Sequence, residues 1–366
     1  MSNSVTSKPT IIGWDIGGAH LKAVVLDANG MQMSCIQLPC ALWRGLTELE
    51  SSIKAVFSQI GLQPHDVLHA VTMTGELVDL FPNRYTGVCE IAKYAVGLLG
   101  QDTFFYAADN GLVQLDEVAE NALQIASTNW HASASLLAKH VSNALLIDIG
   151  STTTDIIPIV HGKVALEGLS DGSRMQHDVL VYTGVVRTPI MALAQKLTLS
   201  DGAEEIEMNV AAEFFATTAD VYRLTGELPL AKDMAETADG QGKTQQESAR
   251  RLARMVGFDL EDKPIEAWVK LAFSCRALQL KQLKSATLKH LKPNIPIIGA
   301  GAGSFLVQAL AAELDCEYRL LTDVLKSEPG QLANDSQLAD LEMCFPAHAV
   351  ARLALNSQSL HKAACL

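Results

Sequence analysis

The stretch Leu146–Pro158, which reads LIDIGSTTTDIIP, constrains the fold of this chain more than any other. An apolar run ends at an acidic residue, Asp148, and Gly150 follows it; four hydroxyl residues then lead into a second acidic and apolar run from Asp155. Apolar runs on either side of a glycine turn predict a strand, a tight turn and a returning strand. The N–H groups and hydroxyls of such a turn suit a phosphate, and Asp148 and Asp155 lie near enough to hold its metal. The stretch therefore predicts an enzyme that handles phosphate.

The N-terminal stretch Ile11–Asp27 follows the same pattern. It reads IIGWDIGGAHLKAVVLD, with Asp15 near the end of one apolar run and Gly17 and Gly18 at the turn before the next. The two glycines permit positive φ and a close backbone approach, and Lys22 can neutralise an oxyanion. A glycine pair beside an acid also occurs in ordinary hairpins, but two such hairpins in one chain favour two lobes built on one repeated unit.

Length and composition agree with two lobes. A chain of 366 residues with 48% apolar content buries a large core, and we predict one lobe over 1–142 and a second over 143–366, with a helical insertion at about 200–256. No apolar run reaches the ~18 residues that a membrane span needs. The polar start Met1–Thr10 has no apolar signal core, so we expect a short disordered tail and a cytoplasmic protein. The net charge of −13 argues against nucleic acid as a partner, because phosphate backbones call for clustered Lys and Arg.

A polar segment of the first lobe holds acid–base candidates. A buried strand over Val67–Met73 runs into TMTGELVD, where Glu76 and Asp79 fall at a strand end, the place where open α/β sheets bind ligands. Glu76 could be a general base or a metal ligand; the alternative is an acid near a helix start that offsets the helix dipole. Arg84 could grip an anionic substrate or pair with a surface acid. His131 could face the cleft; the alternative is that it only satisfies local hydrogen bonds.

The second lobe continues past the central hairpin with a turn at Leu169–Gly172 and with Val179–Pro189, a strand that ends in a polar cluster. In that cluster Arg187 beside Thr183 would suit a phosphate or carboxylate, with a scaffolding ion pair as the alternative. The segment Glu204–Arg254 shows no strand pattern and is predicted to be helical. Its arginines at 250, 251 and 254 are most simply a solvated face.

A third Gly-rich turn lies late in the chain. Ile295–Phe305, IPIIGAGAGSF, predicts a strand, a turn over 299–303 and a helix, with Gly299, Gly301 and Gly303 in the turn. Such a turn lets the N-terminus of a helix approach a ligand closely. The spacing is GxGxG rather than the GxGxxG of dinucleotide-binding folds, so a nucleotide or substrate loop is favoured over a Rossmann fold.

The order of these three elements resembles the superfamily of sugar kinases, heat-shock chaperones and actin. The resemblance covers both lobes and implies an α/β chain with the two-lobed actin-like ATPase (ribonuclease H-like) fold, in which two phosphate loops and an adenosine loop face one cleft. It also implies that Asp15 and Asp148 hold Mg²⁺ through water. The phosphate oxygens would be held by the turn residues Gly17, Gly18, Gly150, Ser151, Thr152 and Thr153.

Within the superfamily, IDIGSTTTDI resembles the hydantoinase and oxoprolinase branch, whose members cut or close amide rings with ATP. The words GWDIGGAHLK, TMTGEL, STNW, YTGVVRTP and TADG resemble more closely a smaller group linked to tetrahydromethanopterin-dependent one-carbon metabolism. Archaeal members of that group resemble a methanofuran-biosynthesis synthase. In its reaction a tyramine-type phenol attacks an aminomethylfuran diphosphate, which gives an aryl ether and releases pyrophosphate.

This resemblance implies a small-molecule diphosphate and a phenol as substrates, with Mg²⁺ as cofactor. Asp15, Asp148 and Lys22 would stabilise the leaving pyrophosphate, and Glu76 or Asp79 would take the phenol proton. The late Gly-rich turn leaves room for ATP, so an ATP-dependent hydrolase of a cyclic amide, or a small-molecule kinase, is the alternative. A homo-oligomer is compatible with the sequence, which does not identify the acceptor.

Overall fold

The computed structural model describes residues 10–201, 204–325 and 341–357 of the chain. Contacts between residues divide the chain into two compact units. Unit 1 comprises Met1–Asn143, Ile159–Arg174 and Leu321–Leu366, and unit 2 comprises Ala144–Pro158 and Met175–Leu320. The sequence suggested one boundary at 142/143, whereas two later segments of the chain return to unit 1.

The sheet of unit 1 is built around the first predicted hairpin. Its strands lie in the order β3 (Gln32–Pro39), β2 (His20–Leu26), β1 (Ile11–Ile16), β4 (Leu68–Met73), β5 (Thr103–Tyr106) and β6 (Leu112–Val113). Strands β1 and β3 are each antiparallel to β2, and β4 and β5 run parallel to β1 and β4 respectively. Parallel neighbours need long crossover connections, and helices α1 and α2 provide them.

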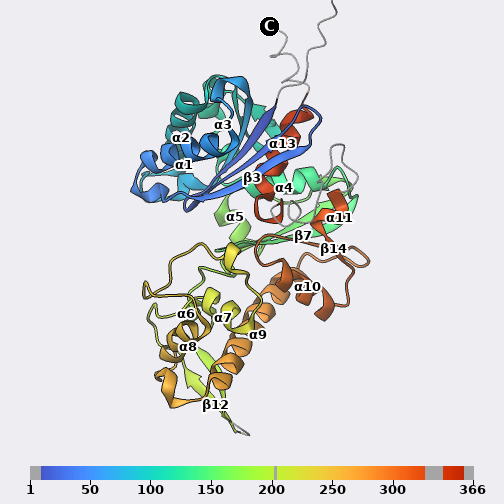
Figure 1. Cartoon of the computed structure of the whole chain (residues 1–366). Coiled ribbons are helices and arrows are strands. Elements are labelled where there is room, and N and C mark those ends of the chain that lie inside the picture. The colour runs from blue at the N-terminus through green and yellow to red at the C-terminus, as the bar shows by residue number, and fades with distance from the viewer. Residues whose placement is uncertain (1–9, 202–203, 326–340, 358–366) are drawn as a thin grey trace, which may run out of the picture. The chain divides into compact units, whose positions relative to one another are not determined.

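Helices cover this sheet on two faces. The helices that contact its strands are α1 (Leu46–Ile60), α2 (Arg84–Leu99), α3 (Val118–Ile125), α4 (Asn129–Leu137) and α13 (Phe345–Leu355). Unit 1 also holds the start of α5 (Asp171–Gln176), the short helix α11 (Leu321–Leu325), and 3-10 turns at Leu42–Arg44, Pro64–Asp66, Gly75–Leu77, Ala108–Asn110 and Leu115–Glu117. Figure 1 shows α1, α2 and α3 together on one face and α13 on the other. Because α13 packs directly on β1, the C-terminal segment belongs to unit 1.

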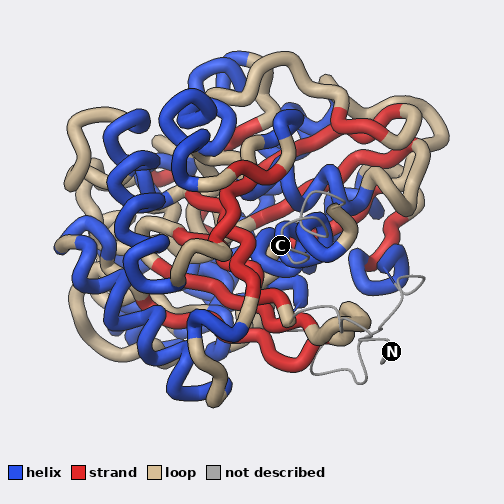
Figure 2. The backbone as a smooth tube through the Cα atoms, turned by 90° about the horizontal axis from the view of Figure 1, so that it is seen from above, coloured by secondary structure: helices blue, strands red, loops and turns tan. Residues whose placement is uncertain are grey.

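The sheet of unit 2 repeats this plan around the second predicted hairpin. Its order is β10 (Leu180–Val181), β8 (Thr154–Val160), β7 (Asn143–Ile149), β13 (Ile297–Ala300) and β14 (Tyr318–Leu320), and β9 (Lys163–Val164) pairs with β8. As in unit 1, a hairpin is followed by strands that run parallel to its first strand. Strands, drawn red, and helices, drawn blue, make up much of the described backbone in Figure 2. The repeat predicted from the two hairpin sequences is therefore present in the sheets, and a dinucleotide-binding sheet is not.

The predicted helical insertion is correct only in part. Helices α6 (Ile190–Leu193), α7 (Thr218–Thr225), α8 (Gln245–Arg254), α9 (Ile265–Leu288) and α10 (Ser304–Glu313) form in unit 2, with 3-10 turns at Leu230–Lys232 and Leu260–Asp262. However, Glu204–Asn209 is a strand, β12, which pairs antiparallel with β11 (Lys196–Asp201). The buried side chains of this hairpin include Leu197 and Leu199 of β11, whereas β12 is mostly polar, so its own sequence gave little strand signal.

The second correction concerns the arginines that were predicted to be solvated. Arg250 and Arg254 are exposed, but Arg251 is fully buried on α8. Its guanidinium donates to Asp220 Oδ1 at 2.8 and 2.9 Å and to Asp239 Oδ1 at 2.9 Å. A buried guanidinium is tolerated when acids pair with it. The main acid lies 31 residues away, so helical periodicity could not reveal it.

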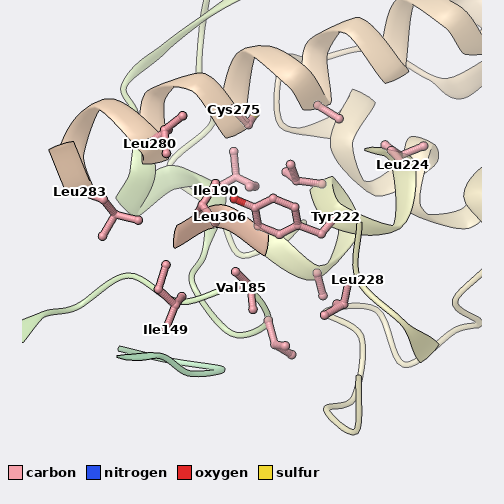
Figure 3. Close-up of a cluster of buried hydrophobic side chains, with 14 of the residues drawn as sticks. Ile149, Val185, Ile190, Tyr222, Leu224, Leu228, Cys275, Leu280, Leu283 and Leu306 are labelled. Carbon is pink, nitrogen blue, oxygen red and sulfur yellow. The ribbon is translucent and has the colours of Figure 1, made fainter. Parts of the chain in front are cut away.

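The apolar core of unit 2 lies directly behind the loop that carries Thr183 and Gly184. Figure 3 shows Tyr222 surrounded by aliphatic side chains of this core, among them Val185 and Leu306. The Tyr222 hydroxyl donates to Gln279 Oε1 at 2.5 Å, and the Gln279 amide in turn donates to Thr183 Oγ1 and to the Gly184 carbonyl, each at 2.9 Å. The buried core therefore fixes the loop that carries Thr183 and Gly184. Within the described part of the chain, no helix is both long and apolar enough to cross a membrane.

Gly13 should be essential for packing α13 on β1. A Cβ atom at Gly13 would lie 2.0 Å from the Ala347 carbonyl oxygen, which is backbone and cannot rotate away. We expect Gly13→Ala to lower the free energy of unfolding by about 1–3 kcal/mol, measured by urea titration. Gly97→Ala is the control, because nothing lies within 4 Å of the added methyl group and Ala favours a helix. An unchanged stability of Gly13→Ala would contradict this packing.

Candidate functional site

The turn of the first hairpin, Gly17–Ala19, is closed by a backbone hydrogen bond from Gly17 N to the His20 carbonyl at 3.0 Å. The carbonyls of Gly18 and Ala19 accept hydrogen bonds from the segment that follows β3. The N–H groups of Gly18 and Ala19 find no acceptor among the described residues. A short run of unused N–H groups is what an anion requires.

The turn of the second hairpin, Gly150–Thr153, has the same construction. Gly150 N donates to the Thr153 carbonyl at 2.9 Å, and the Ser151 carbonyl accepts from the backbone N–H of Arg187 at 2.8 Å. Within the described ranges the N–H groups of Ser151 and Thr152 have no acceptor. The Arg187 side chain is exposed and makes no ion pair with a described residue, so the scaffolding alternative finds no support there.

One expectation about these turns is wrong. Neither Gly17 nor Gly18 has positive φ. Glycine is needed instead for space, because a Cβ at Gly17 would lie 2.9 Å from the His20 carbonyl oxygen and one at Gly18 would lie 2.8 Å from Val78 Cγ1. The predicted close approach of the backbone is correct.

Asp15 and Lys22 face each other across the first hairpin. They are register partners, and Lys22 Nζ lies 3.1 Å from Asp15 Oδ2. Asp15 is buried, and its Oδ1 has no hydrogen-bond partner among the described residues; the same holds for Thr72 Oγ1 on the adjacent strand, where Thr72 is the register partner of Asp15. Unsatisfied buried oxygens are costly, so they fit a hydrated cation that donates through its water.

Asp148 lies at the end of β7 in unit 2, half-buried, and the late Gly-rich turn packs against it. Gly301 has φ +82°, and a Cβ there would lie 2.3 Å from Asp148 Oδ1. Gly303 N donates to the Ile149 carbonyl at 2.9 Å. Gly299 instead packs against the Tyr318 ring. Asp15 and Asp148 belong to different units, so their shared Mg²⁺ stays a prediction; among the described residues no three His, Cys, Asp or Glu gather as a metal site.

Glu76 follows β4 and is the most strongly perturbed acid of the predicted set. Its side chain is 1% exposed, its Oε1 accepts from Ser127 Oγ at 2.6 Å, and its Oε2 is buried without a partner in the described part of the chain. Burial raises the pKa of Glu76 to about 7; Asp171 adds to the rise, whereas Ser127 and Arg84 oppose it. A carboxyl with this pKa exchanges protons near neutrality, as a general base must.

Two features hold Glu76 in place. A Cβ at Gly87 of α2 would lie 2.8 Å from the Glu76 carbonyl, so only glycine lets the helix approach this closely. Ser127 has φ +54°, in the left-handed region. Any residue other than glycine is strained in this conformation, by about 1 kcal/mol or more. Such strained residues cluster at functional sites, and here the strain directs a hydroxyl to Glu76.

The sequence missed a chain of charges beside Glu76. The segment Leu169–Gly172, predicted as a turn, leads into α5, where Asp171 accepts from Arg84 Nη2 at 3.2 Å and lies 3.7 Å from Arg174 Nη1. The Arg174 guanidinium lies over the Trp130 ring, 4.1 Å from its centroid. Arg84 and Asp171 are 87 residues apart, so no local pattern could have joined them.

Asp79 and His131 are less suitable than Glu76 for acid–base chemistry. Asp79 is exposed and has no hydrogen-bond partner in the described ranges, so Glu76 is the better base candidate. His131 is buried beside Tyr106, whose hydroxyl lies 2.8 Å from His131 Nδ1, and burial lowers the pKa of His131. His131 therefore satisfies local hydrogen bonds, which was the simpler of the two alternatives predicted for it.

The fold and these turns define an α/β protein of the actin-like type, as the sequence predicted. Acetone carboxylase in its nucleotide-free form, an enzyme of ATP-dependent acetone carboxylation, has a similar structure with a TM-score of 0.50 at 10% identity, covering 83% of this chain and 67% of that one. At this identity the likeness shows a shared fold alone. The hydantoinase/oxoprolinase family model matches residues 68–337, and the chain belongs to that family.

Two archaeal relatives carry the same name, (4-{4-[2-(gamma-L-glutamylamino)ethyl]phenoxymethyl}furan-2-yl)methanamine synthase. The protein of Methanocaldococcus jannaschii is 28% identical over 351 residues, which is 94% of this chain and 98% of that protein. The protein of Methanococcus vannielii is 32% identical over 163 residues, 43% of this chain and 71% of that protein.

Replacing Glu76 should change how stability depends on pH. Because the pKa is raised to about 7 from 4.5, the folded protein holds this proton more tightly than the unfolded chain, and wild type loses stability as pH rises between these values. We expect Glu76→Gln to gain up to about 3 kcal/mol relative to wild type between about pH 5 and about pH 8, measured by urea unfolding.

Glu90→Gln is the matched control for this measurement, because Glu90 is an exposed acid of α2. We expect its difference from wild type to be the same at both pH values. A Glu76→Gln difference that does not change with pH would mean that the carboxyl is already ionised in the folded protein at about pH 5.

Proposed function

We propose that this chain is a synthase of methanofuran-type cofactor biosynthesis, which joins an aminomethylfuran diphosphate to a tyramine-type or tyrosine-type phenol and releases pyrophosphate. The relatives named above support the proposal, one of them over 94% of the chain. Their name describes a phenoxymethyl-furan with a methanamine group, which is an aryl ether. The observation on this chain that carries the proposal is the buried Glu76 carboxyl with its unpaired Oε2.

Glu76 supplies the acid–base step. As the phenol oxygen forms a bond to the methylene carbon of the furan, the phenol proton passes to Glu76 Oε2. The bond between that carbon and the diphosphate oxygen breaks, and its electron pair leaves with pyrophosphate. Ser127 holds Oε1 at 2.6 Å and thereby directs Oε2. Because the pKa of Glu76 is about 7, much of the enzyme carries the ionised base at neutral pH.

The hairpin turns serve the leaving group. Negative charge grows on the diphosphate as the carbon–oxygen bond breaks, and donors already in position stabilise it without reorganisation. In unit 1 these donors are the N–H groups of Gly18 and Ala19 with the Lys22 ammonium. In unit 2 they are the N–H groups of Ser151 and Thr152 with the Arg187 guanidinium.

Asp15 and Asp148 are the residues that would hold Mg²⁺ in this proposal. The unpaired Oδ1 of Asp15 suits a water of a hydrated cation. A bound Mg²⁺ supplies positive charge that neutralises the diphosphate. Lys22 Nζ lies 3.1 Å from Asp15 Oδ2 and orients that carboxylate.

An ATP-dependent hydrolase or small-molecule kinase is the second candidate. The packing of the Gly301 turn against Asp148 favours it, because a Gly-rich turn before a helix can approach a nucleotide. Titration calorimetry with Mg²⁺ and ATP distinguishes the two candidates. The hydrolase or kinase requires saturable ATP binding, which Gly301→Ala should weaken, whereas the synthase requires none.

The synthase proposal is tested by product formation. Purified protein with Mg²⁺ and aminomethylfuran diphosphate should release pyrophosphate only when a phenol such as tyramine is added, in equal amount with the aryl ether. Pyrophosphate and ether are measured in the same sample. Inorganic phosphate released from ATP, with no ether formed, would refute the proposal.

Asp148→Asn should abolish turnover without unfolding the protein. The substitution keeps the shape of the side chain but removes the charge that holds Mg²⁺, and we expect a loss in kcat of about 10²–10³ or more. Asp178→Asn is the control, because Asp178 is a partly exposed acid of the same unit that pairs with Lys289. An active Asp148→Asn variant would refute the metal role.

A further inference from the structure

The acid–base step proposed for Glu76 has an energetic difficulty. A phenol has an ordinary pKa of about 10, whereas the pKa of Glu76 is about 7. Transfer of the phenol proton to this carboxyl therefore costs about 4 kcal/mol if nothing else acts on the phenol oxygen. A positive group that contacts the oxygen as it becomes negative would lower that cost.

Arg84 is placed to be that group. It is the first residue of α2, whose N-cap Asn83 accepts from Thr86 N at 2.9 Å, and its side chain is 33% exposed. Its Nη2 donates to Asp171 Oδ2 at 3.2 Å. The Nε and Nη1 groups donate to no described residue, so the guanidinium still has donors for a ligand.

Asp171 neutralises Arg84 only in part, because the same carboxylate also lies 3.7 Å from Arg174 Nη1. Arg84 acts on the charge of Glu76 and lowers the pKa of its carboxyl, so the two groups are within electrostatic reach. Asp109 lies 3.7 Å from His131 Nε2 on another segment of unit 1, and water screens its charge because its side chain is 89% exposed.

An apolar surface flanks Arg84 and Glu76 along the chain. Leu77, Leu80 and Tyr85 are large apolar side chains that are all exposed on this one segment, although Phe81 between them is buried. Exposed apolar side chains on the same short segment as a buried acid and a half-exposed cation suit a flat apolar ligand with one polar end. A phenol has that character.

We propose that Arg84 donates to the oxygen of the acceptor phenol and stabilises the phenolate while Glu76 takes its proton. This inference rests on the proposed function, and it assigns the acceptor site to the segment 76–85. Asp171 is a positioning residue, because it orients the guanidinium through Nη2 and leaves the other nitrogen atoms for the phenol. In this role Arg84 determines which phenols the enzyme accepts, since the benefit depends on phenol acidity.

A series of tyramines with increasing ring fluorination tests the proposal, because fluorine makes the phenol more acidic at little cost in size. With tyramine, Arg84→Gln should lower kcat/KM by about 10²–10³. With the most acidic tyramine, whose own pKa approaches that of Glu76, the loss should shrink to less than about tenfold. Arg84→Lys, which keeps the charge, should recover part of the activity.

Lys93→Gln is the matched control, since Lys93 is an exposed cation of the same helix. It should leave kcat/KM unchanged with every phenol. The inference is overturned if the loss in Arg84→Gln is equal for all phenols while wild type still releases pyrophosphate, or if Arg84→Lys recovers nothing. No phenol-dependent pyrophosphate from wild type would remove the proposed function and the acceptor role of Arg84 together.

A binding measurement without the diphosphate separates these cases further. The phenolate form of a fluorinated tyramine absorbs at longer wavelength than the phenol, so its pKa in the complex is read by ultraviolet titration. Bound to wild type, that pKa should lie below its value in free solution. In Arg84→Gln the lowering should be lost, and a lowering that is equal in both proteins would contradict the contact.

Discussion

One backbone hydrogen bond recurs in both units and the proposed chemistry depends on it. It runs from Gly17 N to the His20 carbonyl in unit 1 and from Gly150 N to the Thr153 carbonyl in unit 2. Each bond closes a tight turn whose carbonyls accept hydrogen bonds from another loop of the same unit, while the N–H groups between the two bonded residues have no acceptor among the described residues. The proposed anion binding would thus follow from how each sheet begins. The two units repeat the device with different side chains, Lys22 in one and Arg187 in the other.

Glu76, the proposed acid–base group, depends on burial rather than on a turn. Glu76 is 1% exposed and is held by a serine in a left-handed conformation and by a glycine of α2 that allows close contact. These features cost stability, and the cost is tolerable because the unit around them has a large apolar core. Their result is a carboxyl that is neither firmly ionised nor firmly neutral near pH 7. The Arg84 guanidinium opposes the rise and lowers the pKa of this carboxyl.

The sequence predicted the parts of this arrangement that are local. Apolar runs around Asp15 and Asp148 predicted both hairpins, and the strand before Glu76 placed this acid just after a strand end, as β4 confirms. Contacts between segments that are distant in the sequence could not be predicted from local patterns. Ser127 lies 51 residues from Glu76, and Asp171 lies 87 residues from Arg84.

Polar segments were misjudged for the same reason. Arg251 looked solvated because its partner Asp220 lies on another helix, and β12 looked helical because the apolar side chains of its hairpin belong to β11. In both cases a tertiary partner, rather than the local pattern, determines the state of the residue. The positive φ expected at Gly17 and Gly18 failed because these glycines serve to make space.

The central claim is that the hairpin turns stabilise a departing diphosphate and that no phosphoryl group is transferred. It is tested most directly by placing ¹⁸O in the atom that bridges the furan methylene carbon and the first phosphorus of the diphosphate. The account predicts that the carbon–oxygen bond breaks, so all of the label leaves in pyrophosphate, as seen by the isotope shift in ³¹P NMR. Label that stays on the furan product would show cleavage at phosphorus and would contradict the account.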